Sequence, residues 1–127
     1  MVGIVIVSHS QKLAESVVEL TKMMAADAKI ESAGGMEDGG LGTSFEKISK
    51  AIEKVYSDDG VIVLVDMGSA VMTTEMVIES LTDKKVKIAD CPLVEGAVTA
   101  TVEATTGSDM ESILKELEKV GTIKKLQ

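Results

Sequence analysis

The sequence predicts an α/β fold with a mostly parallel central sheet of four or five strands and helices on both faces. Two continuous β-branched runs, GIVIVS at residues 3–8 and VIVLV at residues 61–65, are typical of strands buried on both faces of a sheet. Segments with apolar residues at helical spacing follow them, and strands that alternate with helices form a parallel sheet. We expect one domain over residues 1–127, a length that can bury a substantial core.

In the first half of the chain, the strand at residues 3–8 leads into a helix whose apolar stripe is expected to face the core. The stripe consists of Leu13, Val17, Leu20 and Met24. A short second strand is predicted at Lys29–Ala33, followed by a loop with five glycines at residues 34–44 (GGMEDGGLGTS). Ser44 can cap the next helix, which carries an apolar face from Lys47 to Tyr56.

The middle of the chain repeats this pattern. Asp58-Asp59-Gly60 forms a turn before the buried strand at residues 61–65. A helix is expected from about Ala70 to Leu81, and a fourth strand at Val86–Ala89.

Two more helices are predicted at the C-terminal end. The only proline, Pro92, suits the entry to a helix over Leu93–Thr105. Gly107-Ser108-Asp109 ends that helix and caps the next. The last helix has an apolar stripe made of Met110, Ile113, Leu117 and Val120.

The composition limits the classes of ligand. Only Phe45 and Tyr56 are aromatic, so the interior must consist of Val, Ile, Leu, Ala and the eight Met, and base stacking on single-stranded nucleic acid is not expected. A formal charge of −8 repels nucleic acid and anionic lipid, and it favours a basic protein partner.

Cysteine usage and hydropathy predict a location in the cytoplasm. The single cysteine, Cys91, cannot form an internal disulfide, which fits a reducing compartment. The initial apolar run of about six residues lacks a basic flank and a cleavage site, so neither a signal peptide nor a membrane span is expected.

Chemically useful residues follow three predicted strands. In an open parallel sheet, ligands bind beyond the carboxyl ends of the strands, near the switch in strand order. The three segments are Ser8-His9-Ser10, the glycine-rich loop with Gly40, Gly42 and Thr43, and Asp66-Met67-Gly68-Ser69. We therefore expect a histidine, a carboxylate, hydroxyls and flexible backbone to meet in one crevice.

His9, the only histidine, is the candidate nucleophile, although a surface histidine in a loop is the simpler interpretation. A carboxylate such as Asp66 can bond one ring nitrogen, fix the tautomer and leave the other nitrogen free. Asp66 could instead only cap the following helix. Helix N-termini offer N–H groups to phosphoryl oxygens, so the set predicts a phosphohistidine site. The predicted phosphoryl-binding residues are Ser10, Gly42, Thr43, Gly68 and Ser69.

Other phosphate chemistries fit less well. A receiver domain would need acidic metal ligands where His9 and its serine neighbours stand, and the P-loop pattern GxxxxGK[ST] is absent. All 13 basic residues are lysine, whereas histidine phosphatases usually place an arginine beside the histidine. No metal site is expected, because one His and one Cys stand about eighty residues apart.

Four segments in order, MVGIVIVSHS, GLGTS, VDMGSA and CPLVEGAVTATVEA, carry a resemblance over essentially the whole chain. Together they resemble DhaM, the family of phosphotransfer subunits of phosphoenolpyruvate-dependent dihydroxyacetone kinase. Its domain is related to the mannose-type enzyme IIA of the sugar phosphotransferase system. The resemblance implies a mannose-type enzyme IIA-like fold, with His9 matching the phosphorylated histidine and Asp66 the aspartate that bonds the ring.

The resemblance also implies partners. The phosphoryl group would come from the phosphocarrier HPr and pass to ADP held with Mg²⁺ on the subunit DhaL, while this chain binds no cofactor itself. A homodimer is implied as well. Two alternatives stay open at this point: an enzyme IIA component of a mannose-family sugar transporter, and a regulatory module whose phosphorylation controls a partner. The Ser8-His9-Ser10 turn and the Met67–Ala70 segment favour the dihydroxyacetone branch.

Overall fold

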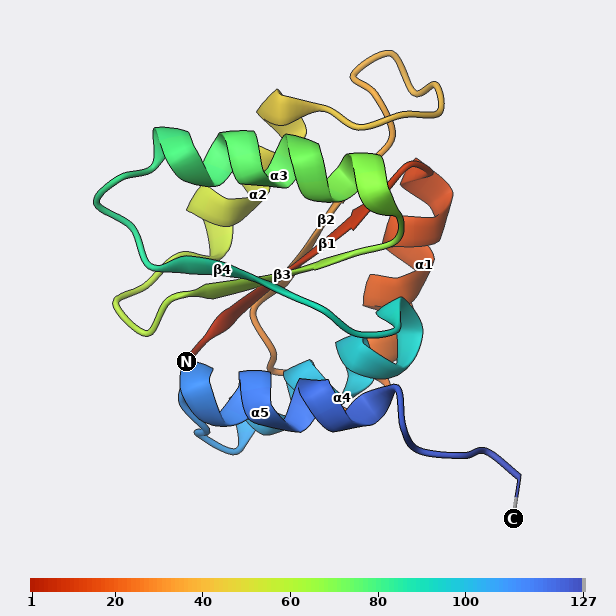
Figure 1. Cartoon of the computed structure of the whole chain (residues 1–127), viewed down its shortest axis with the longest axis vertical. Coiled ribbons are helices and arrows are strands. Elements are labelled where there is room, and N and C mark those ends of the chain that lie inside the picture. The colour runs from red at the N-terminus through yellow and green to blue at the C-terminus, as the bar shows by residue number, and fades with distance from the viewer. Residues whose placement is uncertain (127) are drawn as a thin grey trace.

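Four strands and five helices alternate along residues 1–126, which the computed structural model describes. In chain order they are β1 (Gly3–Ser8), α1 (Gln11–Lys22), β2 (Ile30–Gly34), α2 (Phe45–Val55), β3 (Val61–Val65), α3 (Gly68–Ser80), β4 (Val86–Ala89), α4 (Leu93–Thr105) and α5 (Met110–Val120). All neighbouring strands are parallel, in the order β2-β1-β3-β4 (Figure 1). The predicted α/β class, the parallel sheet and the alternation are confirmed, with shifts of a few residues at element ends.

Helices cover both faces of the sheet, which explains why the central strands are apolar at every position. Ile4 and Ile6 of β1 contribute to the core under α1, α4 and α5, whereas Val5 and Val7 contribute to the core under α2 and α3. Each of these four side chains is fully buried. In Figure 1, α3 lies on one side of the sheet and α4 and α5 lie on the other.

The helix caps follow the sequence. Ser44 caps α2 by accepting from the Lys47 amide at 3.2 Å, and Asp109 caps α5 by accepting from the Ser112 amide at 2.9 Å. Both predicted caps are confirmed. Within residues 1–126, no helix has the length and apolar character that spanning a bilayer requires.

The apolar stripe predicted for the first helix is confirmed at Val17 and wrong at its other three residues. Leu13, Leu20 and Met24 are exposed, and α1 buries Ala14 and Thr21 beside Val17. Small side chains are needed on this face because α1 packs close to both β2 and α4. Gly34 at the end of β2 shows how close: a Cβ there would stand 2.7 Å from the Ala14 Cβ.

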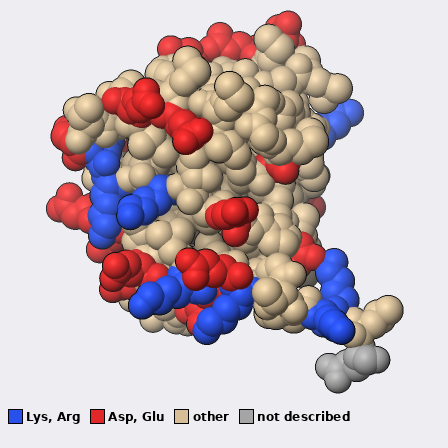
Figure 2. Space-filling view, in the orientation of Figure 1, with Lys and Arg blue, Asp and Glu red and all other residues tan. Residues whose placement is uncertain are grey.

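The methionines also differ from the prediction. Of the eight, only Met110 is buried, and seven are exposed, so the core is built from Val, Ile, Leu and Ala. Three of the exposed methionines, Met67, Met72 and Met76, belong to α3 and its N-cap. In Figure 2 the surface over the start of α3 is mostly tan with a single red patch beside it, whereas charged side chains crowd the region over α5.

Candidate functional site

The site lies at the switch point of the sheet. β1 and β3 are neighbours and Val7 pairs with Val65, so the residues that follow each strand meet at the same edge. His9 and Asp66 are 57 positions apart in sequence but are joined by hydrogen bonds. The topology therefore brings together the predicted nucleophile and the predicted carboxylate.

Asp66 holds both the ring and the backbone of His9. Its Oδ1 lies 2.9 Å from His9 Nδ1, and its Oδ2 accepts from the His9 amide at 2.9 Å. Oδ1 also accepts from the Met67 amide at 2.7 Å. Partial burial raises the pKa of Asp66, but the hydrogen bonds from His9, Ser8 and Met67 outweigh it and hold the pKa below its ordinary value. The ionised carboxylate makes Nδ1 the protonated nitrogen of the neutral ring and leaves a lone pair on Nε2.

Ser8 belongs to the first of the three predicted segments, but no role at the site was predicted for it. It is fully buried at the end of β1; its hydroxyl donates to Asp66 Oδ2 at 2.9 Å and accepts from the Ser10 amide at 3.0 Å. Ser8 thus fixes the carboxylate against the chain that carries His9. The sequence signal that could have identified Ser8 is a hydroxyl at the end of an apolar strand, because a buried hydroxyl requires a hydrogen-bond partner.

Ser69 binds the other nitrogen of the ring. The Ser69 hydroxyl hydrogen-bonds His9 Nε2 and, because that nitrogen carries the lone pair, it is the donor. Helix α3 begins at Gly68 without a side-chain cap on its N-cap residue, Met67. The Ala70 amide already donates to the Met67 carbonyl, so the amides of Gly68 and Ser69 are left facing past the start of the helix.

The other three predicted phosphoryl-binding residues make no hydrogen bond to the ring in the part of the chain that the structure describes. Ser10 caps α1, its hydroxyl accepting from the Leu13 amide at 3.1 Å. The Gly42 amide donates to the His9 carbonyl at 2.8 Å, from a backbone with φ of +140° that favours glycine. Thr43 Oγ1 lies 2.8 Å from Thr73 Oγ1 and joins the glycine-rich loop to α3. Gly42 therefore anchors this loop on His9, and a phosphoryl contact by Ser10, Gly42 or Thr43 stays a prediction.

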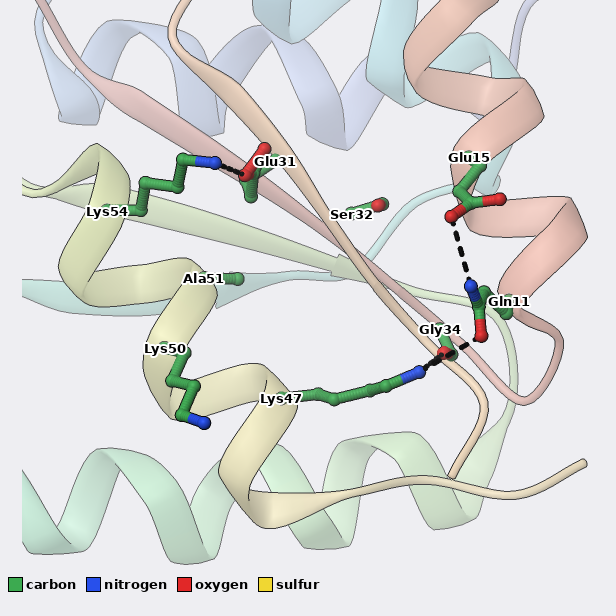
Figure 3. A pocket seen from close by; sticks show the side chains of 9 residues that line it. All are labelled: Gln11, Glu15, Glu31, Ser32, Gly34, Lys47, Lys50, Ala51 and Lys54. Atoms are coloured by element: carbon green, nitrogen blue, oxygen red, sulfur yellow. Dashed lines mark hydrogen bonds and ion pairs between the residues drawn. The ribbon is translucent and has the colours of Figure 1, made fainter. Parts of the chain in front are cut away.

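The site is open to solvent. The His9 side chain is 24% exposed and that of Asp66 is 12% exposed, so a partner can reach the ring while the carboxylate stays sheltered. A groove of about 330 Å³ lies elsewhere, between α1 and α2 along β2. Lysines from α2 cross it in Figure 3: Lys47 donates to the Gly34 carbonyl at 2.8 Å and Lys54 pairs with Glu31 at 2.8 Å. No ring-contacting residue lines that groove.

In residues 1–126, no three His, Cys, Asp or Glu side chains gather where they could hold a metal ion. Cys91 lies far from His9 in sequence, packed against the position of Gly96. Its burial and the nearby Asp90 raise the pKa of the thiol to about 11, so it remains protonated at neutral pH.

Comparison with known proteins shows the family of this chain. The family model EIIA-man, described as PTS system fructose IIA component, matches residues 3–114. The phosphotransferase subunit DhaM of the PTS-dependent dihydroxyacetone kinase of Lactococcus lactis is 40% identical over 118 residues, covering 93% of this chain and 94% of the relative. The DhaM of Escherichia coli, the phosphoryl donor subunit of a PEP-dependent dihydroxyacetone kinase, is 41% identical over 121 residues. That match covers 90% of this chain but only 26% of the longer relative.

Among solved structures, a protein of unknown function, EF1359, has 32% sequence identity and a TM-score of 0.83, over 94% of this chain and 95% of the other. The fold, the family model and the curated relatives thus agree over nearly the whole length. This chain belongs to the mannose-type EIIA family and, within it, to the DhaM phosphotransferase subunits of dihydroxyacetone kinase.

Proposed function

We propose that this chain is a phosphohistidine carrier that accepts a phosphoryl group from HPr on Nε2 of His9 and passes it to ADP on the DhaL subunit. The observation that carries the proposal is the division of labour between the two ring nitrogens. Nδ1 is bound to Asp66 at 2.9 Å, whereas Nε2 faces the open start of α3. The names of the curated relatives, phosphotransferase or phosphoryl donor subunits of dihydroxyacetone kinase, support the same role.

The chemistry follows from this division. The Nε2 lone pair attacks the phosphorus of the donor phosphohistidine, a P–N bond forms on His9, and the donor P–N bond breaks with its electron pair returning to the donor ring. Positive charge on the His9 ring is stabilised by the Asp66 carboxylate. Before attack the Ser69 hydroxyl must turn away from Nε2, and it can then donate to a phosphoryl oxygen. The amides of Gly68 and Ser69 supply further donors, strengthened by the helix dipole.

The remaining partners are part of the same proposal. The chain acts as a homodimer in the cytoplasm, binds no cofactor itself, and relies on ADP and Mg²⁺ held by DhaL for the second transfer. The charge of −8 favours a donor and an acceptor that present basic surfaces.

The test is a reconstituted relay. The protein is mixed with phosphoenolpyruvate, enzyme I and HPr, and the phosphorylated residue is located by mass spectrometry under alkaline conditions. We expect acid-labile phosphate on His9 and its discharge when DhaL carrying ADP is added. No labelling by competent phospho-HPr would contradict the donor step. Discharge only to an enzyme IIB domain would instead assign the chain to a sugar transporter.

A further inference from the structure

Three side chains of the site are joined by a continuous chain of hydrogen bonds. Phosphoryl transfer does not require a serine hydroxyl bound to Nε2 of the unphosphorylated ring. Ser69 Oγ hydrogen-bonds His9 Nε2, and His9 Nδ1 lies 2.9 Å from Asp66 Oδ1. The carboxylate is fixed in turn by Ser8 and by two backbone amides. A hydroxyl, an imidazole and an oriented carboxylate in this order are the nucleophile, base and orienting group of acyl transfer, whatever the fold that presents them.

The position of Ser69 suits a nucleophile. It lies in the first turn of the helix that follows a buried parallel strand, at the carboxyl edge of the sheet, and its side chain is exposed. A Cβ at the neighbouring Gly68 would meet no atom within 4 Å outside its own chain neighbours and helix backbone, so the surface at Gly68 is open to a small substrate. The free amides of Gly68 and Ser69 can donate to an oxyanion that forms beside the Ser69 hydroxyl.

We propose that Ser69, His9 and Asp66 also act as a serine triad that hydrolyses small activated esters of short acids. The substrate class follows from the surroundings. Ser69 lies outside the groove between α1 and α2, and two exposed methionines stand close to it in the chain, Met67 (59% exposed) and Met72 (67% exposed). A short acyl group can lie on these flexible apolar side chains.

The reaction balances without any further reagent. Ser69 Oγ attacks the ester carbonyl as its proton passes to His9 Nε2, and the tetrahedral oxyanion is held by the two amides. The intermediate collapses to acyl-Ser69, and the alcohol leaves with the proton from Nε2. Water then attacks the acyl-serine with His9 again as base, releasing the acid and restoring the hydroxyl.

This activity and the carrier role exclude each other on one molecule, because both use the lone pair of Nε2. Phosphorylation of His9 is therefore expected to abolish ester hydrolysis. This one expectation rests on the proposed function, whereas the triad itself depends only on the hydrogen bonds around the unphosphorylated ring.

The experiment uses the intact protein with p-nitrophenyl acetate and, separately, a fluorophosphonate probe. We expect release of p-nitrophenolate above the buffer rate, an acetyl group on Ser69 in acid-quenched samples, and covalent labelling of Ser69 by the fluorophosphonate. Ser69→Ala and His9→Ala should each lower the enzymatic rate by about tenfold or more. Ser16→Ala, at an exposed serine of α1 outside the site, is the matched control and should behave as wild type.

Each other outcome overturns the proposal. Hydrolysis that survives Ser69→Ala but not His9→Ala would make the imidazole the nucleophile, and hydrolysis that survives both would be a surface reaction. Circular dichroism shows whether each variant is folded. For Ser69→Ala, phosphorylation by HPr is a second check that does not depend on ester hydrolysis. If ester hydrolysis is absent but His9 is phosphorylated normally, the triad proposal fails and the carrier role stands. If ester hydrolysis is present but His9 is not phosphorylated, the carrier role fails and the triad stands.

Discussion

Helices α1 and α3 both begin beside His9, yet their first turns are completed in different ways. At α1 the Ser10 hydroxyl accepts from the Leu13 amide, and the Ser10 amide is itself held by Ser8. At α3 the N-cap residue is Met67, which offers no side-chain oxygen. The first turn of α1 is therefore capped by a side chain of its own segment, whereas the first turn of α3 has backbone amides that remain available to a ligand.

The difference shows that one topological position can serve stability in one helix and chemistry in the next. Both helices follow buried strands at the same sheet edge. A serine cap of this kind stabilises a protein by ~0.5–2 kcal/mol, which α3 forgoes. What α3 has instead is a hydroxyl on Nε2 and two amides, so we expect substitutions at α1 to change stability and those at α3 to change transfer.

The largest effect is expected from His9→Ala, which removes the ring between the two helix starts. Phosphoryl acceptance from HPr should be lost completely while the fold and the melting temperature stay near wild type, because the ring is partly exposed. Radiolabel transfer and circular dichroism measure the two quantities. Phosphate retained on the variant, at Asp66 for instance, would point to a receiver-like mechanism.

Asp66→Asn should have the next largest effect. It exchanges a charged acceptor for an amide and removes a charge-assisted hydrogen bond worth ~1.5–3 kcal/mol. Transfer should therefore slow by roughly ten- to a hundredfold, measured as the rate of phosphohistidine formation at fixed phospho-HPr. An unchanged rate would leave Asp66 as a structural residue that only receives the backbone amides.

Ser69→Ala tests the open start of α3. The loss of one neutral hydroxyl donor costs ~0.5–1.5 kcal/mol, so phosphoryl transfer should fall by about two- to tenfold with little change in stability. Rapid-quench experiments measure the rate of phosphoryl transfer, and thermal unfolding measures the stability. A large loss of stability with a normal transfer rate would show that Ser69 serves stability, as Ser10 is expected to do at α1, and would contradict the difference between the two helices.

Ser10→Ala is the matched substitution at the closed start. We expect unfolding to become easier by ~0.5–2 kcal/mol, measured by urea titration, and phosphoryl transfer to stay within about twofold of wild type. If transfer falls as far as in Ser69→Ala, Ser10 contacts the phosphoryl group as the sequence analysis predicts, and the two helix starts share the task.

The smallest effects on the donor step are expected from changes in the solution. Exchange between two phosphohistidines needs positioned N–H donors more than a metal, so transfer from HPr should survive EDTA while discharge to ADP should stop. Loss of the donor step in EDTA would contradict the metal-free transfer.

Raising the salt concentration from about 0.05 to 0.5 M shortens the screening length to a few Å and should slow the donor step, since the chain carries a charge of −8. A rate that does not change with salt would show that electrostatic steering plays no part in the donor step.

The sequence predicted the parts of the fold that rest on periodicity and caps. Continuous β-branched runs gave the central strands, and Ser44 and Asp109 marked two helix starts. It failed where packing distance decides, since Leu13 and Leu20 have the right spacing for a buried stripe. Only the close approach of α1 to β2 and α4 selects Ala14 and Val17, and a single sequence does not report that distance.

At the site, topology was sufficient for His9 and Asp66 because both end neighbouring strands. Topology was not sufficient to predict which of the nearby serine hydroxyls binds which group of the site. Ser8, Ser10 and Ser69 all lie within three residues of His9 or Asp66 in sequence. Whether each one faces the carboxylate, the helix start or Nε2 depends on side-chain direction, which the pattern of residues leaves open.

The sheet order has one more consequence, for how the chain can be divided. His9 and Asp66 lie on opposite sides of the glycine-rich loop, whose residues 36–41 are exposed, and a side chain at Gly39 would meet nothing within 4 Å. A cut at Gly39 gives one fragment with β1, α1 and β2 and a second with the remaining elements, joined across the β1–β3 ladder. Neither piece holds a complete site, so we expect phosphate on His9 only when the two pieces reassemble.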